Sequence, residues 1–97
     1  MPELDLDEKC VSFINELVGK IFPYAEIFIY GSRTQGKARE YSDVDIALKG
    51  DISFEGLLTV RALFEDSTFP YKVDVVDLNS LDEKFFAVIK DDLYRIN

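Results

Sequence analysis

The chain has 97 residues, of which 47% are hydrophobic and 31% are charged, so we expect one globular domain over residues 1–97 with a modest core. Its 19 acidic and 11 basic residues give a net charge of −8. This disfavours direct binding to nucleic acid, which requires an excess of lysine and arginine, and it suits a basic protein partner.

Membrane insertion and secretion are not expected. No apolar run approaches the roughly 20 residues that span a membrane, and the acidic N-terminus has no signal-peptide pattern. The single cysteine, Cys10, has no partner for an internal disulfide. We therefore expect a cytoplasmic protein in which Cys10 is a buried thiol on the apolar side of a helix.

The first half of the chain predicts a helix followed by two strands. Apolar residues three and four apart predict an amphipathic helix over residues 5–22, which Pro23 ends. The apolar run at residues 26–30 predicts the first strand. A Gly-Ser turn and a short helix over residues 33–38 follow it, and the alternation over residues 44–48 predicts the second strand.

The second half repeats the alternation of helix and strand. Ser53 is placed to cap a helix over residues 54–65, and residues 71–78 predict a third strand. Residues 80–83 form a capping box that opens a last helix, whose apolar stripe runs to Ile96. This order predicts an α/β fold: a small mixed sheet of three strands, or of four, with helices packed on one face.

The turn after the first strand has the composition of a phosphate-binding loop. Gly31 lets the backbone turn sharply and approach a ligand closely, and Ser32 can cap the N-terminus of a short helix. Free N–H groups and the positive end of the helix dipole would then face an anion.

Two aspartates beyond this turn point to a metal site. Asp43 and Asp45 lie two residues apart, so in a strand they share a face, about 6.5–7 Å apart along the chain. Such a pair is often no more than a solvated acidic surface. Like charges 4 Å apart repel by about 4 kcal/mol at an effective dielectric of 20, which favours a cation between them. Oxygen ligands of this kind suit Mg²⁺.

A third carboxylate is expected on the neighbouring strand, where Asp74 and Asp77 are the candidates. They are three residues apart and therefore face opposite ways in a regular strand. Because Val73 and Val75 should face the helices, parity places Asp74 with the acidic pair and Asp77 on the other side.

The combination resembles the signature of the DNA polymerase beta-like nucleotidyltransferase superfamily, and the short chain resembles its minimal branch, MNT. Six identities within fifteen residues carry the resemblance: Gly31, Ser32, Gly36, Ser42, Asp43 and Asp45. The third acid of that family lies between hydrophobic residues, as Asp74 does. The resemblance also implies the α/β fold predicted above.

The resemblance implies a two-metal phosphoryl transfer that uses ATP. Asp43, Asp45 and Asp74 would hold two Mg²⁺ ions, and Asp74 would help to position and deprotonate an acceptor hydroxyl. The nucleotide contacts would come from the residues of the turn: Gly31, Ser32, Arg33, Gly36 and Lys37. Many minimal members carry a second arginine near Gln35, which is neutral here.

The resemblance also implies a partner. Larger relatives bind the acceptor with a second domain, which a chain this short is not expected to contain, so a partner would supply that part of the site. Minimal members are commonly paired with a small helical HEPN toxin and act as its antitoxin by transferring AMP to a tyrosine. Two alternatives stay open: transfer to a small molecule such as an aminoglycoside, and a binding module that neutralises its partner by contact alone.

Overall fold

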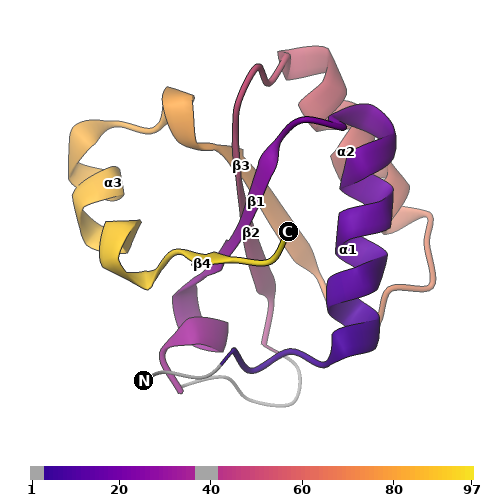
Figure 1. Cartoon of the computed structure of the whole chain (residues 1–97), viewed down its shortest axis with the longest axis horizontal. Helices are drawn as coiled ribbons and strands as arrows, with labels where there is room; N and C mark the ends of the chain where they lie inside the picture. Colours follow the sequence, from indigo (N-terminus) through magenta and orange to yellow (C-terminus); the bar gives the residue numbers. More distant parts are fainter. Residues whose placement is uncertain (1–3, 37–41) are drawn as a thin grey trace.

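The computed structural model describes residues 4–36 and 42–97. A four-stranded sheet separates two helices on one side from a third helix on the other (Figure 1). The elements are α1 (Glu8–Ile21), β1 (Glu26–Tyr30), the 3-10 helix η1 (Gly31–Thr34), β2 (Val44–Lys49), α2 (Phe54–Glu65), β3 (Val73–Asp77), the 3-10 helix η2 (Leu78–Ser80), α3 (Glu83–Ile89), the 3-10 helix η3 (Lys90–Asp92) and β4 (Tyr94–Arg95).

The sheet has the strand order β3-β2-β1-β4 and is mixed. β1 pairs antiparallel with β2 and with β4, whereas β2 pairs parallel with β3. The register places Tyr30 opposite Asp45, and Asp45 opposite Asp74. These residues therefore form one row across three adjacent strands and face the same side of the sheet.

The helix face, which packs against α1 and α2, carries the main core. Alternate strand residues and one stripe of each helix meet there, and several side chains are fully buried. Burying each aliphatic side chain contributes about 1.5–3 kcal/mol. The core includes Ile14, Val18, Ile27, Ile29, Val44, Ile46, Leu48, Val60 and Val75.

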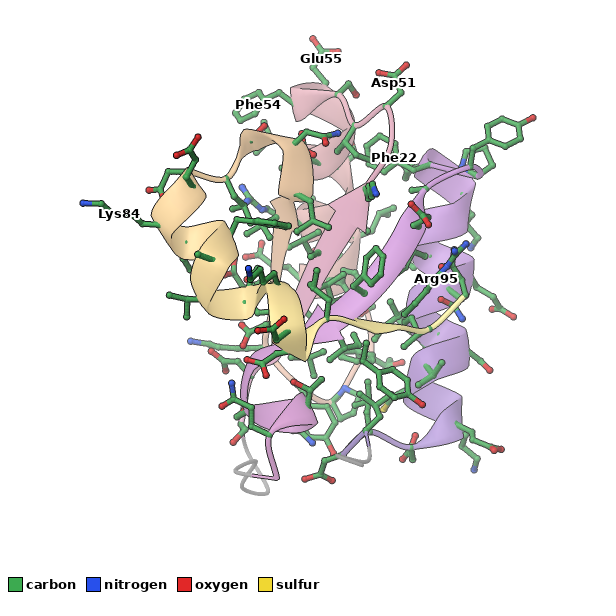
Figure 2. All side chains as sticks on the ribbon, turned by 60° about the vertical axis from the view of Figure 1, so that its left-hand side comes forward. Phe22, Asp51, Phe54, Glu55, Lys84 and Arg95 are labelled. Atoms are coloured by element: carbon green, nitrogen blue, oxygen red, sulfur yellow. The ribbon has the colours of Figure 1, made fainter. Side chains whose placement is uncertain are left out.

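The other side, which we call the carboxylate face, is only partly covered. Ile89 of α3 packs there with Tyr30 and Ala47, and Lys84 projects outward from the same helix (Figure 2). The predicted α/β class and mixed sheet are confirmed. The prediction of helices on one face alone is wrong for α3, because its buried residue contacts the strand residues of opposite parity.

Local caps explain where the helices begin. The Asp7 side chain accepts a hydrogen bond from the Cys10 amide (2.8 Å), so α1 begins at Glu8 rather than at residue 5. Ser53 caps α2 as predicted, with its Oγ accepting from the Gly56 amide (3.0 Å). The cap of α3 is Asp82, not Ser80.

The C-terminal segment differs from the prediction. α3 ends at Ile89, and the chain finishes in β4, which pairs with β1 instead of continuing as a helix. Asn97 fixes this end, since its side chain accepts from the Ile27 amide (2.9 Å) and donates to the Ala25 carbonyl (2.8 Å). Hydrogen bonds to the edge of β1 thus outweigh the helical spacing of the last apolar residues.

Cys10 is a free and buried thiol, as expected, and burial raises its pKa to about 11. Such a thiol is unreactive near neutral pH. Within the described ranges, no helix has the length and apolar character needed to cross a membrane.

Candidate active site

The turn after β1 brings the backbone against a carboxylate. Gly31 has φ = +79°, a conformation that favours glycine. A Cβ atom at this position would lie 2.5 Å from Oδ2 of Asp45. Backbone conformation and close approach therefore both require glycine here, and the turn that begins η1 lies directly beside the Asp45 side chain.

The helix predicted over residues 33–38 is instead η1, which starts at Gly31 and ends at Thr34. Thr34 Oγ1 donates to the Gly31 carbonyl (2.9 Å), and the Gln35 amide donates to the Ser32 carbonyl (3.3 Å). Ser32 therefore lies inside the turn rather than capping it. Lys37, the other predicted cationic contact, lies outside the described residues.

The predicted carboxylates share one face of the sheet. Asp74 lies opposite Asp45 in the register of β2 and β3, and Asp43 precedes Asp45 by two residues. Asp77 has the other parity, and its carboxylate accepts from the Asn79 amide and the Ser80 hydroxyl (both 3.0 Å). The structure thus agrees with the parity argument and gives Asp77 a role in a turn.

The carboxylates repel each other electrostatically. Asp45 is half-buried while Asp43 and Asp74 are exposed. Burial, and then the charges of Asp74 and Asp43, raise the pKa of Asp45 to about 6. Burial, Asp45 and Asp74 likewise raise the pKa of the Tyr30 phenol to about 12. Ionising Asp45 therefore costs free energy that a bound cation would offset.

The oxygen atoms of Asp43, Asp45 and Asp74 are ligands that suit Mg²⁺, although these side chains do not converge on one point. In the part of the chain that the structure describes, no three carboxylate, histidine or cysteine side chains converge closely enough to hold an ion. Asp43 and Asp74 are nevertheless exposed, on the same face as the half-buried Asp45. Three carboxylates on adjacent strands supply the oxygen ligands that Mg²⁺ prefers.

Arg33 takes a structural position, not that of a phosphate ligand. Its side chain is 4% exposed. Its guanidinium donates to the carbonyls of Asp5 (3.1 Å) and Ser42 (2.7 Å) and lies 4.2 Å from the ring centroid of Tyr71. It joins the N-terminal segment, the start of β2 and the start of β3, so we leave Arg33 out of the proposed nucleotide contacts.

Gln35 connects the turn to the C-terminal part of the chain. Its Nε2 donates to Oδ2 of Asp92 in η3 (2.7 Å). Gln35 therefore links the turn after β1 to η3.

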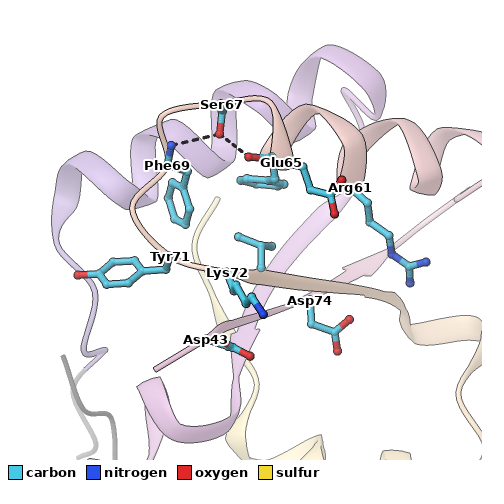
Figure 3. A pocket seen from close by; sticks show the side chains of 10 residues that line it. Asp43, Arg61, Glu65, Ser67, Phe69, Tyr71, Lys72 and Asp74 are labelled. Atoms are coloured by element: carbon cyan, nitrogen blue, oxygen red, sulfur yellow. Dashed lines mark hydrogen bonds between the residues drawn. The ribbon is translucent and has the colours of Figure 1, made fainter. Parts of the chain in front are cut away.

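A pocket of about 550 Å³ opens beside two of the carboxylates (Figure 3). The Ser67 hydroxyl holds its upper wall, donating to the Phe64 carbonyl (2.6 Å) and accepting from the Phe69 amide (3.1 Å). Sequence reasoning missed this pocket, although aromatic residues just before the strand of the third acid were a signal for it. The lining residues are Asp43, Arg61, Phe64, Glu65, Ser67, Phe69, Tyr71, Lys72, Val73 and Asp74.

Comparisons with known proteins agree with this geometry. The family described as "Polymerase beta, Nucleotidyltransferase" matches residues 14–93, which include the Gly31 turn and all three carboxylates. A relative named "Probable protein adenylyltransferase MntA", from Haemophilus influenzae (strain ATCC 51907 / DSM 11121 / KW20 / Rd), is 27% identical over 90 residues, covering 91% of this chain and 79% of the relative. The resemblance drawn from the sequence is therefore confirmed: the chain belongs to the polymerase beta nucleotidyltransferase family and is a nucleotidyltransferase of its minimal type.

Proposed function

We propose that this nucleotidyltransferase transfers AMP from ATP to a hydroxyl group of a partner protein. The observation that carries the proposal is the row of Asp45 and Asp74 across two strands, with Asp43 on the same face and the Gly31 turn against Asp45. The name of the Haemophilus relative supports a protein acceptor. The acceptor proposed here is a tyrosine of a HEPN toxin, which makes the chain its antitoxin.

The Gly31 turn would bind the leaving pyrophosphate. Only a glycine allows the backbone this close to Asp45, and the Ser32 hydroxyl and nearby N–H groups are donors suited to phosphate oxygens. Gly36 also has a positive φ, +69°, a conformation that favours glycine. The turn would thus place the terminal phosphates next to the carboxylates.

Asp43, Asp45 and Asp74 would hold the Mg²⁺ ions. When bound, Mg²⁺ offsets the charge of the phosphates and carboxylates and polarises the phosphoryl group. Asp45, the half-buried member, is fixed by the strands on both sides of it and would orient the nucleotide.

Asp74 would serve the acceptor, because it lies on the edge strand and is exposed. Its carboxylate would orient the acceptor hydroxyl and accept its proton. The acceptor oxygen then forms a bond to the α-phosphorus as the bond from that phosphorus to pyrophosphate breaks. The products are AMP joined to the acceptor through a phosphodiester, pyrophosphate and a proton released to solvent.

Label transfer tests the proposal. The purified chain, Mg²⁺ and ATP labelled with ³²P at the α-position are incubated with host extract, in parallel with Asp43→Asn and the matched control Asp51→Asn. Asp51 is an exposed aspartate that projects from the far end of the molecule (Figure 2). We expect label on one small protein with the wild type and the control, and at least about a hundredfold less with Asp43→Asn.

Three outcomes would contradict the proposal. Full activity of Asp43→Asn would show that the carboxylates are not the site. Binding of ATP without any labelled protein would instead indicate a small-molecule acceptor, and failure to bind ATP would indicate inhibition by contact alone.

A further inference from the structure

The helix α3 exposes a run of apolar residues on the carboxylate face. Of the seven residues of this helix, only Ile89 is buried. The four residues before it, Phe-Phe-Ala-Val at positions 85–88, are all exposed, and Val88 is 74% exposed. Consecutive apolar residues on the surface of a soluble domain are unfavourable unless another surface covers them. The outer side of α3 therefore has the composition of an interface.

α3 stands directly beside the carboxylates. The ring of Phe85 meets the ring of Tyr30 edge to face (6.3 Å between centroids), and Tyr30 lies opposite Asp45 in the register of β1 and β2. Figure 1 shows α3 apart from α1 and α2, on the other side of the sheet. A helix with its side chains is about 10–12 Å across, so α3 forms a wall of roughly that height next to the candidate site.

A folded acceptor that reaches the carboxylates also meets this wall. Neighbouring strands are about 4.8 Å apart, so Asp74 lies about 10 Å across the sheet from Tyr30. A folded domain is wider than that, since 100 residues have a radius of gyration of about 13 Å. A side chain with its hydroxyl at Asp74 is shorter than α3 is tall, so the backbone that carries it lies level with the helix and its neighbours contact residues 85–88.

A cavity of about 370 Å³ opens on the other side of α3. Lys49, which lines it, is four residues beyond Asp45 in β2, so the cavity lies about 13 Å along the strand from the carboxylates. Protein interfaces are anchored by side chains that fill such pockets, and an apolar side chain of a docked protein suits this one. Its apolar lining consists of Phe28, Leu78, Leu81, Phe86 and Leu93.

Acidic residues surround these apolar surfaces. One acidic pair lies at the start of α3, another lies in η3 directly after it, and the carboxylates of the candidate site border it. Lys84 and Lys90 are the lysines of the same segment, so the rim is negative and favours a basic partner. A second copy of this chain, with its own net charge of −8, would be repelled. The acidic residues are Asp43, Asp45, Asp74, Asp82, Glu83, Asp91 and Asp92.

We propose that α3 and the cavity beside it form the docking surface for the acceptor protein, whose matching surface is apolar at its centre and basic at its rim. This rests on the proposed function and adds where the partner binds and what surface it presents. α2 also exposes apolar residues, among them Phe54 and Leu58. Because α2 packs on the helix face, a protein engaged at the carboxylates does not contact them.

Steady-state label transfer tests the docking surface, with the purified protein that the wild type labels as acceptor. Val88→Lys places a positive charge at the centre of the surface, at a residue that belongs to neither core, so it should fold. Leu58→Lys is the matched control on α2, where Leu58 is 45% exposed. We expect Val88→Lys to raise KM for the acceptor at least about tenfold, with kcat and KM for ATP unchanged. Leu58→Lys should change none of the three.

A substitution of the opposite sign tests the charge of the rim. Lys84 projects outward from α3 (Figure 2), and Lys84→Glu makes the rim more acidic. We expect this variant to have a lower KM for the acceptor than the wild type. Added salt should raise the wild-type KM, because it screens the attraction between the two rims. A higher KM for Lys84→Glu would refute a basic partner surface.

Amide chemical shifts locate the contact without catalysis. The unlabelled acceptor is added to the uniformly ¹⁵N-labelled full chain in the absence of nucleotide, and we expect shifts in residues 78–93. If transfer occurs but the shifts fall in residues 54–65, or if Val88→Lys leaves KM unchanged, the docking surface is refuted and the proposed function stands. If the wild type labels no protein, the proposed function fails and the docking surface fails with it.

Discussion

The two faces of one sheet treat the same strands in opposite ways. On the helix face, Ile46 and Val75 are fully buried among apolar side chains. On the carboxylate face, one residue away along each strand, Asp45 and Asp74 lie opposite each other, and the charge of Asp74 helps to raise the pKa of Asp45. Burial on the helix face stabilises the fold, whereas repulsion between the carboxylates on the other face destabilises it. Substitutions at adjacent residues of one strand should therefore change the free energy of unfolding in opposite directions.

The largest expected effect is on the helix face. Ile46→Ala removes a fully buried side chain from the centre of the core, and we expect the free energy of unfolding to fall by about 2–5 kcal/mol. Urea denaturation followed by circular dichroism measures this loss. Ile46→Val, the conservative control, should cost about 0.5–1.5 kcal/mol. Equal losses for the two variants would show that the core tolerates a cavity here.

Arg33→Met tests whether this arginine is structural. The Asp5 and Ser42 carbonyls lose a donor and Tyr71 loses its stacked cation, so we expect a loss of about 2–4 kcal/mol. Arg95→Met is the control, because Arg95 forms an exposed ion pair with Glu26 (2.9 Å) worth less than about 1 kcal/mol. Thermal unfolding of both variants measures the two losses of stability. A stable Arg33→Met that had lost only ATP binding would restore Arg33 as a phosphate ligand.

Gly31→Ala would strain the backbone of the turn after β1, beside the carboxylate of Asp45. Its φ is positive and its Cβ would meet the Asp45 carboxylate, so we expect about 1–3 kcal/mol of destabilisation together with loss of transfer. Gly36→Ala separates the two causes, since φ is also positive there (+69°) but, among residues 4–36 and 42–97, no atom beyond the chain neighbours lies within 4 Å of the added Cβ. If both variants unfold at the same temperature, the approach to Asp45 does not contribute.

Local signals explain why much of this arrangement was predictable. β1 and α2 have the predicted bounds, residues 26–30 and 54–65, because alternation, helical spacing and a capping serine all act within a few residues. The choice of Asp74 over Asp77 likewise needed only the parity of a strand. The site's acidic residues could therefore be located before any contact between strands was known.

Distant contacts explain what the sequence did not reveal. Spacing shows that Arg33 follows the Gly-Ser turn but not that it folds inward, because its acceptor at Asp5 is 28 residues away. The last strand depends on the hydrogen bond from the Ile27 amide to the Asn97 side chain, which joins residues 70 positions apart. Helical spacing near the C-terminus carries no sign of such a partner, and a helix was predicted there instead.

The smallest effect has the opposite sign and belongs to Asp45. Its pKa in the folded protein is about 6, whereas the ordinary pKa of an aspartate is 3.8, so between these pH values the folded state binds more protons than the unfolded state. Stability therefore falls as pH rises through this window. Asp45→Asn removes the penalty, and after allowance for solvent screening of a half-exposed group we expect about 1 kcal/mol of stabilisation at pH 7 and none at pH 3.5.

Thermal unfolding at both pH values, with and without Mg²⁺, distinguishes this penalty from a general effect of removing charge. Asp51→Asn, exposed and remote from the carboxylates, should unfold like the wild type at either pH. Because a cation that binds only the folded state stabilises it by mass action, Mg²⁺ should raise the wild-type unfolding temperature and leave Asp45→Asn unchanged. If Asp45→Asn is instead less stable than the wild type at pH 7, the ionised carboxylate does not destabilise the fold, and the contrast between the two faces is wrong.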